Sequence, residues 1–444
     1  MPPTESGGME INMSKKNDEI HLDVYLDRQE LHMSSVVKTY YEGIQSAAAK
    51  QRYEKIKKTL ATDYLQKKLD DLDNAAFSEL STENKHLLEA LVLGVSSEKG
   101  RGLLGVAFLQ LVIKTITPEQ SIRLHKSSNQ RGNFSWKDGI SMRTLNSKYT
   151  GKFLKENGLL NSNKFGSFMT RTLAENYPFS KLYKAEIRGP FDEWIAIVDA
   201  IESNQMPAEP ALSYLMLLLK RNADAFKKLA EDTVVLAKEY SDVTFENILE
   251  IMKRFYNSTY GKARAFEVVM HGLMQAKAEM DTIGDEELVP LSQMRSANKK
   301  HGNVGDIELL LDDIIVEAWD AKYGKTYLLD ELDELRDKLI VNPGVEIAGF
   351  VADKDVDKTD EIMDKISEIT AETSTEIILC SFDEWVKQQV DGFSSDEKNT
   401  LAREWLMSVV ETFALKRPEY APIEEPSEKW LVDIARILYR LSES

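Results

Sequence analysis

Residues 305–325 read GDIELLLDDIIVEAWDAKYGK. Two runs rich in Ile, Leu and Val are separated by a short polar break, which is typical of a β-hairpin. Side chains on a strand alternate between its two faces, so Asp320 and Lys322 are expected to share a face of the second strand. Asp306 opens the first strand. A hairpin of this length predicts that its carboxylate lies beside that of Asp320.

The chemistry of this hairpin points to a metal. Two carboxylates, with the backbone carbonyl of Ala321, would form a hard oxygen site that suits Mg²⁺, for which Mn²⁺ can substitute. Lys322 would add a positive charge at the same place. An acid two residues before a lysine is a common spacing, however, and Glu83–Lys85 and Asp396–Lys398 have it too. On spacing alone, a solvated hairpin face is the simpler interpretation.

Two neighbouring segments strengthen the metal interpretation. The expected helix over 261–274, GKARAFEVVMHGLM, places Glu267 among apolar residues. A buried lone carboxylate is costly, so it needs a partner: a metal is one candidate and a salt bridge to Arg264 is the alternative. His271, on the same helix, is expected to be a core histidine. The linker before the hairpin is basic, with Arg295, Lys299, Lys300 and His301.

The order of elements around the hairpin predicts one α/β domain over 255–390. A helix precedes the hairpin, and further segments follow it. These are a helix at 326–339, a strand at 346–354, a helix at 359–370 and a strand at 375–382. The expected fold class is mixed α+β, with helix-rich N-terminal and C-terminal parts around a core that has a central mixed sheet.

This order of helix with an acid, strand with Asp, strand with DxK, helix, strand, helix, strand resembles the PD-(D/E)xK nuclease core. Gly305 stands where the family usually has proline. The resemblance implies metal ligation by Asp306 and Asp320, a catalytic lysine at Lys322 and a supporting acid at Glu267. Glu308 or Glu317 would be the alternative to that helical acid.

A second resemblance lies upstream. The segments RGLLGVAFLQLVIKTITPEQSIRLHK (101–126), GNFS (132–135) and NYPFSKLYKAEIRGP (176–190) resemble the layout of SacI-type restriction endonucleases. This resemblance covers roughly 100–200, and the nuclease core covers roughly 260–385. It implies a type II restriction endonuclease that makes sequence-specific, Mg²⁺-dependent double-strand cuts in DNA. It also implies a homodimer that matches a palindromic site and a cognate DNA methyltransferase in the host.

The charge distribution agrees with a nucleic-acid partner. The chain carries a net charge of −18, yet 98–188 holds 16 basic and 6 acidic residues, a balance of +10 that leaves −28 elsewhere. A locally basic stretch can bind the phosphates of a nucleic acid even when the whole chain is acidic. The candidate DNA-binding residues are Arg123, Lys126, Arg131, Lys137, Arg143 and Lys148, with Lys299 and Lys300 in the linker.

The predicted organisation has five segments. They are a helical N-terminal region at 1–97, a basic DNA-recognition region at 98–205, a helical connector at 206–254, the nuclease domain at 255–390 and C-terminal helices at 391–444.

Other classes find little support in the sequence. The single cysteine, Cys380, excludes an internal disulfide framework, and no apolar run is long enough for a transmembrane helix. With no apolar core near the N-terminus, we expect a cytoplasmic protein. Walker, GxSxG and HExxH motifs are absent. The alternatives are another PD-(D/E)xK nuclease, for repair or for a particular DNA structure, and a non-catalytic helical DNA-binding protein.

Overall fold

A computed structural model describes most of the chain. The described residues are 20–33, 36–75, 77–95, 99–126, 134–160, 168–291, 303–415 and 427–442. They form two compact units, one extending to Leu219 and the other beginning at Lys220. The boundary falls inside the long helix α8 (Ala208–Glu239), within the predicted helical connector.

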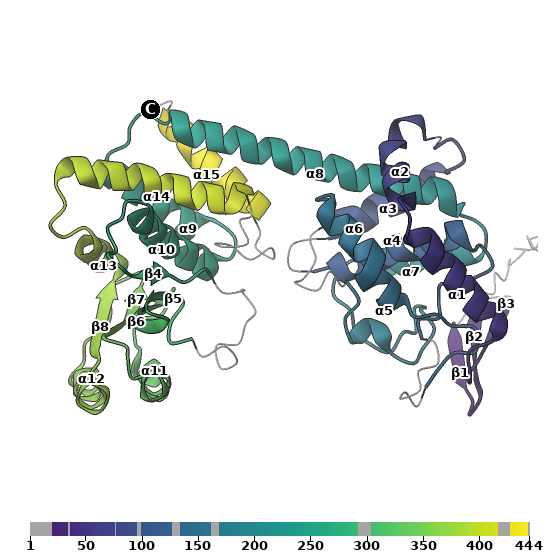
Figure 1. Cartoon of the computed structure of the whole chain (residues 1–444), viewed down its shortest axis with the longest axis horizontal. Helices are drawn as coiled ribbons and strands as arrows, with labels where there is room; N and C mark the ends of the chain where they lie inside the picture. Colours follow the sequence, from purple (N-terminus) through teal and green to yellow (C-terminus); the bar gives the residue numbers. More distant parts are fainter. Residues whose placement is uncertain are drawn as a thin grey trace, which may run out of the picture. The chain divides into compact units, whose positions relative to one another are not determined.

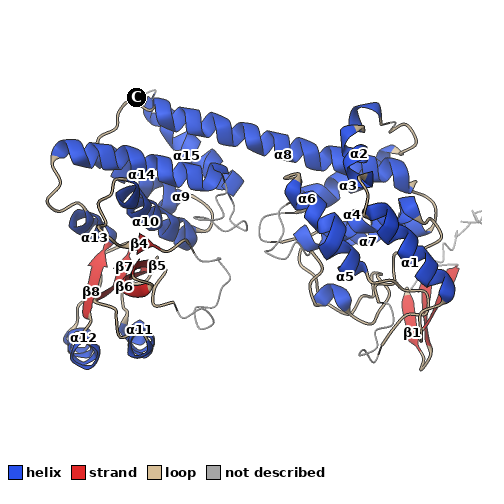
Figure 2. Ribbon diagram, in the orientation of Figure 1, coloured by secondary structure: helices blue, strands red, loops and turns tan. Residues whose placement is uncertain are grey.

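The first unit is mostly helical (Figure 2). Its centre is α4 (Arg101–Ile116), which is buried around most of its circumference because nearly all of its side chains are apolar. Pro118 follows closely, and because a proline disfavours helical backbone at the residue before it, the helix ends at Ile116. The other elements are α1 (Ala47–Leu60), α2 (Tyr64–Asp70), η1 (Leu72–Asn74), α3 (Thr82–Leu93), α5 (Met142–Leu145), η2 (Asn146–Thr150), α6 (Gly151–Glu156), η3 (Thr172–Ala174) and α7 (Phe191–Glu202).

A three-stranded antiparallel sheet also belongs to this unit. It consists of β1 (His21–Val24), β2 (Arg28–Met33) and β3 (Val36–Tyr41), in the order β1-β2-β3. The prediction of a helical N-terminal region over 1–97 is therefore wrong for 21–41, which forms strands.

The reason is tertiary packing. Leu31 and Tyr40 lie on the inner face of the sheet and pack with Leu124 and Trp136, which are distant in sequence. Helical periodicity resumes only after Ser46, whose hydroxyl accepts a hydrogen bond from the backbone N–H of Ala49 and caps α1.

The second unit is built around a five-stranded mixed sheet in the order β4-β5-β6-β7-β8. Strands β4 to β6 are antiparallel, whereas β6, β7 and β8 are parallel. The strands are β4 (Glu287–Leu288), β5 (Ile307–Leu311), β6 (Ile314–Lys322), β7 (Ile347–Ala352) and β8 (Glu376–Ser381). The helices are α9 (Phe245–Ser258), α10 (Lys262–Glu279), α11 (Leu329–Val341), α12 (Asp360–Thr373), α13 (Phe382–Gln389), α14 (Ser395–Leu415) and α15 (Ser427–Ser442).

The predicted hairpin, the two later strands and the helices between them are confirmed. The short β4 and the helix α13 were not predicted.

Helices cover both faces of this sheet (Figure 1). Trp319 of β6 points into the core that contains α10, α13 and α14, and its ring lies 6.1 Å from that of Trp385. On the other face, Ala318 and Phe350 pack with residues of α11 and α12. The predicted alternation of β6 is therefore correct.

His271 of α10 is fully buried, as expected for a core histidine. Its Nε2 lies 3.0 Å from the carbonyl oxygen of Val289. A carbonyl only accepts, so Nε2 carries the proton and donates it. Burial lowers the pKa of His271 to about 4, with the charge of Arg264 acting in the same direction and the hydrogen bond to Val289 opposing it.

This shift predicts acid sensitivity of the second unit. Between pH 6.5 and about 4 the unfolded chain binds a proton at His271 that the folded chain does not, so stability falls as the pH is lowered through this window. The loss should reach about 3 kcal/mol at pH 4. His271→Gln keeps an amide donor for Val289 without titrating, so its stability should depend less on pH. Urea unfolding of both proteins between pH 7 and 4 measures the difference. Replacing the exposed His86 by Gln is the control, and an equally steep loss in His271→Gln would contradict the explanation.

Candidate active site

The hairpin brings Asp306 against the end of β6. The backbone N–H of Asp306 donates to the carbonyl of Trp319 at 2.9 Å. Its side-chain Oδ2 accepts a hydrogen bond from the backbone N–H of Ala321 at 3.0 Å. The carboxyl groups of Asp306 and Asp320 lie close together, and the proximity of Asp320 raises the pKa of Asp306. The predicted juxtaposition of the two aspartates is confirmed.

Gly305 permits this close pairing. A Cβ atom at position 305 would lie 2.7 Å from the carbonyl oxygen of Trp319 and 3.0 Å from its backbone nitrogen. No ordinary side chain tolerates such contacts with backbone, and proline also carries a Cβ. Glycine at position 305 therefore has a physical cause: the chain runs so close to β6 that a Cβ atom would collide with its backbone.

The two alternatives to the helical acid, Glu308 and Glu317, do not join the aspartates. Glu308 is buried and accepts hydrogen bonds from the backbone N–H groups of Val304 and Gly305, so it fastens the turn before β5. Glu317 accepts a hydrogen bond from the indole Nε1 of Trp319, on the face of β6 opposite to Asp320. Neither fits the role of a third acid at the site.

Glu267 does lie close to the aspartates. It forms an ion pair with Arg264 one helical turn earlier. This salt bridge is the alternative to a metal partner that the sequence analysis named. Burial raises the pKa of Glu267 and outweighs the lowering by Arg264, and the negative charge of Asp320 raises it further. The carboxylate therefore has its salt bridge and still lies within the electrostatic reach of Asp320.

Asp306 lies within the electrostatic reach of two other acids, Glu267 and Asp320. Its pKa is raised well above 3.8, first by burial, then by the charges of Glu267 and Asp320, while the N–H of Ala321 acts in the opposite direction. Three carboxyl groups held together away from water repel one another, and a bound cation relieves this repulsion. The donor set consists of carboxylate oxygens, which fits a hard dication such as Mg²⁺. Ala321 contributes its N–H here, and its role as a carbonyl ligand stays a prediction.

Lys322 is held by two acids. Its Nζ lies 2.8 Å from Asp320 Oδ2 and 2.8 Å from Glu331 Oε2. The same Nζ lies 5.3 Å from the centre of the Phe350 ring. Burial lowers the pKa of Lys322, but Asp320 and Glu331 together outweigh burial and raise it, so the ammonium group is charged at neutral pH.

Glu331 is a site residue that sequence analysis missed. It lies in the first turn of α11 and also pairs with Lys325. Its partial burial raises its pKa, but the hydrogen bonds and charges of the two lysines outweigh burial and lower it to about 2. The sequence DELDELRD offers several acids, and nothing in it shows which one faces Lys322.

The turn after β6 is also fixed by an acid. The backbone N–H of Gly324 donates to Asp353 Oδ1 at 2.6 Å, and Gly324 has the positive φ of 76° that glycine adopts readily. Asp353 follows β7, the parallel neighbour of β6, so both strands end at the same edge of the sheet. This contact keeps the end of β6, with Lys322, in place.

The predicted DNA-binding residues fall into different environments. Lys137 and Lys148 are exposed, and the exposed Arg143 donates to the carbonyl of Thr170 at 2.9 Å. Lys126 is half-buried and donates to Asn176. Three candidates lie outside the described residues: Arg131, Lys299 and Lys300.

Arg123 does not fit the predicted role. Its residue is 1% exposed, and its guanidinium donates to the carbonyl of Phe179 and pairs with Asp199 of α7. Buried charges need such partners, so this arginine ties the segment after α4 to α7. The type of residue suggested a DNA contact, whereas its burial shows a structural one.

No protein-family model matches the chain, and neither does any curated protein sequence. Within the described ranges, no helix has both the length and the apolar character needed to cross a membrane.

The close approach of Gly305 to the backbone of Trp319 should make this position sensitive to any added side chain. Gly305→Ala forces a Cβ against the backbone of Trp319, so the second unit should lose about 1–3 kcal/mol of stability. Chemical unfolding followed by tryptophan fluorescence measures this loss. Unchanged stability would show that the segment before β5 can move away from β6 without cost.

Proposed function

We propose that this chain is a divalent-metal-dependent DNA endonuclease of the type II restriction class, which hydrolyses phosphodiester bonds in both strands at a specific sequence. One observation carries the proposal. Asp306 and Asp320 meet across an antiparallel strand pair, and the ammonium of Lys322 lies 2.8 Å from Asp320 at the same edge of the sheet. Two acids and a lysine in this arrangement suit hydrolysis of a phosphodiester.

Asp306 and Asp320 are the residues that would hold Mg²⁺ or Mn²⁺, with Glu267 as the neighbouring acid. The bound metal would polarise a phosphoryl oxygen and lower the pKa of a water molecule. The protein's own part is to keep the two carboxylates together. The N–H of Ala321 orients Asp306, and the helix α10 presents Glu267 from the apolar side.

Lys322 acts as a fixed positive charge. Because its pKa is raised, it stays protonated at neutral pH and does not act as the general base. Its role is to stabilise the negative charge that develops on the phosphoryl oxygens. Glu331 positions this ammonium by accepting one of its hydrogen bonds at 2.8 Å.

The basic balance of 98–188 supports DNA as the substrate, because phosphate neutralisation supplies most of the affinity of DNA-binding proteins. Among the described candidates, Lys137, Arg143 and Lys148 are exposed and suited to phosphate contacts. Sequence-specific cutting, a homodimer and a partner methyltransferase follow from the resemblance to restriction endonucleases and belong to the same proposal.

Cleavage of a long DNA of known sequence tests the function. With Mg²⁺ or Mn²⁺ we expect discrete fragments, and with Ca²⁺ or EDTA we expect none, since Ca²⁺ is the weaker acid for bound water. Asp306→Ala and Asp320→Ala should abolish cutting. A double variant of Asp396→Asn and Lys398→Ala is the matched control, because it removes an acid-x-lysine pair of the same spacing on α14, in which Asp396 is exposed and Lys398 is half-buried.

Each other outcome points to a different protein. Random nicking with Mg²⁺ would replace the restriction proposal by another nuclease of the same core. DNA binding without cleavage in the wild type would indicate a non-catalytic DNA-binding protein. Efficient cutting in EDTA would refute the metal mechanism.

A second prediction separates catalysis from binding. Lys322→Ala should lower the cleavage rate on the order of 10²–10³-fold, because it removes one preorganised charge from the transition state. DNA affinity measured in Ca²⁺ should change little. Glu331→Gln should give a smaller loss, since the ammonium keeps its contact with Asp320. If Lys322→Ala weakens DNA binding as strongly as it slows cutting, the lysine is only a phosphate anchor.

A further inference from the structure

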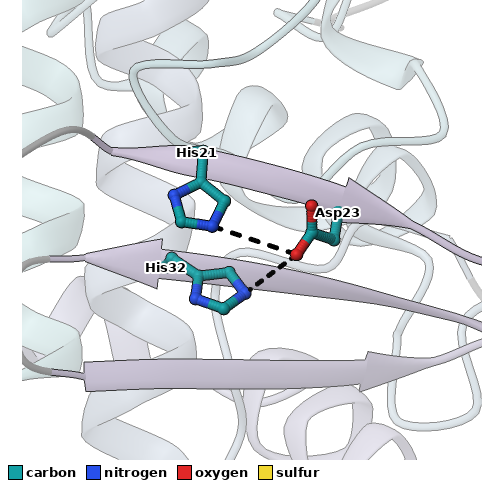
Figure 3. Close-up of side chains that lie close together, drawn as sticks. All are labelled: His21, Asp23 and His32. Carbon is teal, nitrogen blue, oxygen red and sulfur yellow. Dashed lines mark ion pairs between the residues drawn. The ribbon is translucent and has the colours of Figure 1, made fainter.

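The outer face of the small sheet in the first unit carries a second group of metal-ligating side chains. His21 and Asp23 are two residues apart on β1 and therefore share a face, and His32 of β2 lies directly opposite His21 in the register. The two imidazole rings stack with their centres 4.0 Å apart and their planes 14° apart. Figure 3 shows both rings with a nitrogen directed to the carboxylate of Asp23.

The distances suit a single ion. Asp23 Oδ2 lies 3.2 Å from His32 Nε2 and 3.9 Å from His21 Nε2. One donor atom from each of the three side chains lies within 4.8 Å of the other two. Ligands bound tetrahedrally to Zn²⁺ at 2.0–2.2 Å are about 3.4 Å apart. The group is thus close to a ligating arrangement without a change of the backbone.

One of these nitrogens needs a partner. His32 Nε2 is shielded from water, yet it makes no hydrogen bond to any described residue. A shielded polar atom without a bond costs free energy, and its closeness to Asp23 Oδ2 does not provide bonding geometry. The side chains of His21 and Asp23 are 55% and 46% exposed, so an ion has access to the group from solvent.

The neighbouring Arg28 does not compete with a metal ion for Asp23. Arg28 lies on the same face of β2, and its Nε donates to Glu30 at 2.7 Å. Glu30 stands opposite Asp23 in the register, so Arg28 neutralises Glu30 rather than Asp23. Among the described residues, the ion-pair contacts of Asp23 are those with the two imidazoles, at 3.9 Å and 3.2 Å.

We propose that His21, Asp23 and His32 bind Zn²⁺ or a similar first-row transition-metal dication. Two imidazoles and one carboxylate favour such ions over Mg²⁺ and Ca²⁺, which prefer oxygen ligands. Three protein ligands leave one position of a tetrahedral ion open to water. The ion joins the four-residue edge strand β1 to β2 and so stabilises a strand that is too short to be stable alone. This inference is independent of the proposed nuclease function.

Zn²⁺ titration of the full chain without an affinity tag tests the site. Millimolar Mg²⁺ is kept present so that the carboxylate site of the second unit is occupied. The double variant of His21→Asn and His32→Asn should bind one Zn²⁺ per chain fewer than the wild type by isothermal titration calorimetry. Asp23→Asn should weaken the same binding. His86→Asn, which removes an exposed histidine of α3, and Asp320→Asn should both keep it.

Hydrogen exchange provides a readout of the strand pairing. Zn²⁺ should slow exchange of the amides of β1 and β2 in the wild type and leave those of the double variant unchanged. The exchange of α4 reports whether the double variant is folded. Equal Zn²⁺ binding by the wild type and the double variant, or unchanged exchange over 21–33 when Zn²⁺ binds, would overturn the proposal. Neither result depends on whether the chain cuts DNA.

Discussion

The pairing of Asp306 with β6 is the contact on which the candidate active site depends. One backbone bond to Trp319 and one side-chain bond from Ala321 hold the carboxylate of Asp306 beside that of Asp320. The close approach demands glycine at position 305, and Glu308 fastens the neighbouring turn by accepting hydrogen bonds from the backbone N–H groups of Val304 and Gly305. Backbone geometry therefore sets the positions of these two carboxylates.

This geometry has an electrostatic cost that the rest of the second unit offsets. Burial and the neighbouring acids raise the pKa of Asp306, which means that the carboxylates would be more stable apart. Two hydrophobic cores, one on each face of the sheet, hold the strands in register against that repulsion. A single dication would reduce the cost, and Lys322, held by Glu331, already compensates Asp320. Functional sites commonly retain such repulsion between like charges, because carboxylates without a cationic partner in the protein can bind a cationic ligand.

Local patterns predicted most of the second unit correctly, since alternation along 305–325 and the helical periodicity around it arise from each segment burying one face. The same reasoning failed where residues distant in sequence determine the secondary structure or the contacts of a side chain. The strands at 21–41 form because their inner face packs on Leu124 and Trp136. Arg123 has the residue type of a DNA contact but lies under α7, paired with Asp199. Glu308 and Glu317 had the right charge for the site and were assigned to other contacts by the fold.

The sequence by itself determined the hairpin, the shared face of Asp320 and Lys322, and the presence of an acid on an apolar helix. These follow from a period of two in strands and from the cost of burying a lone charge. Only the tertiary structure decided which acids gather around the aspartates, because side chains from α10 and α11 approach the edge of the sheet across long stretches of chain. It likewise decided the group of His21, Asp23 and His32, since antiparallel register sets which side chains face each other, and one residue of slip would separate them.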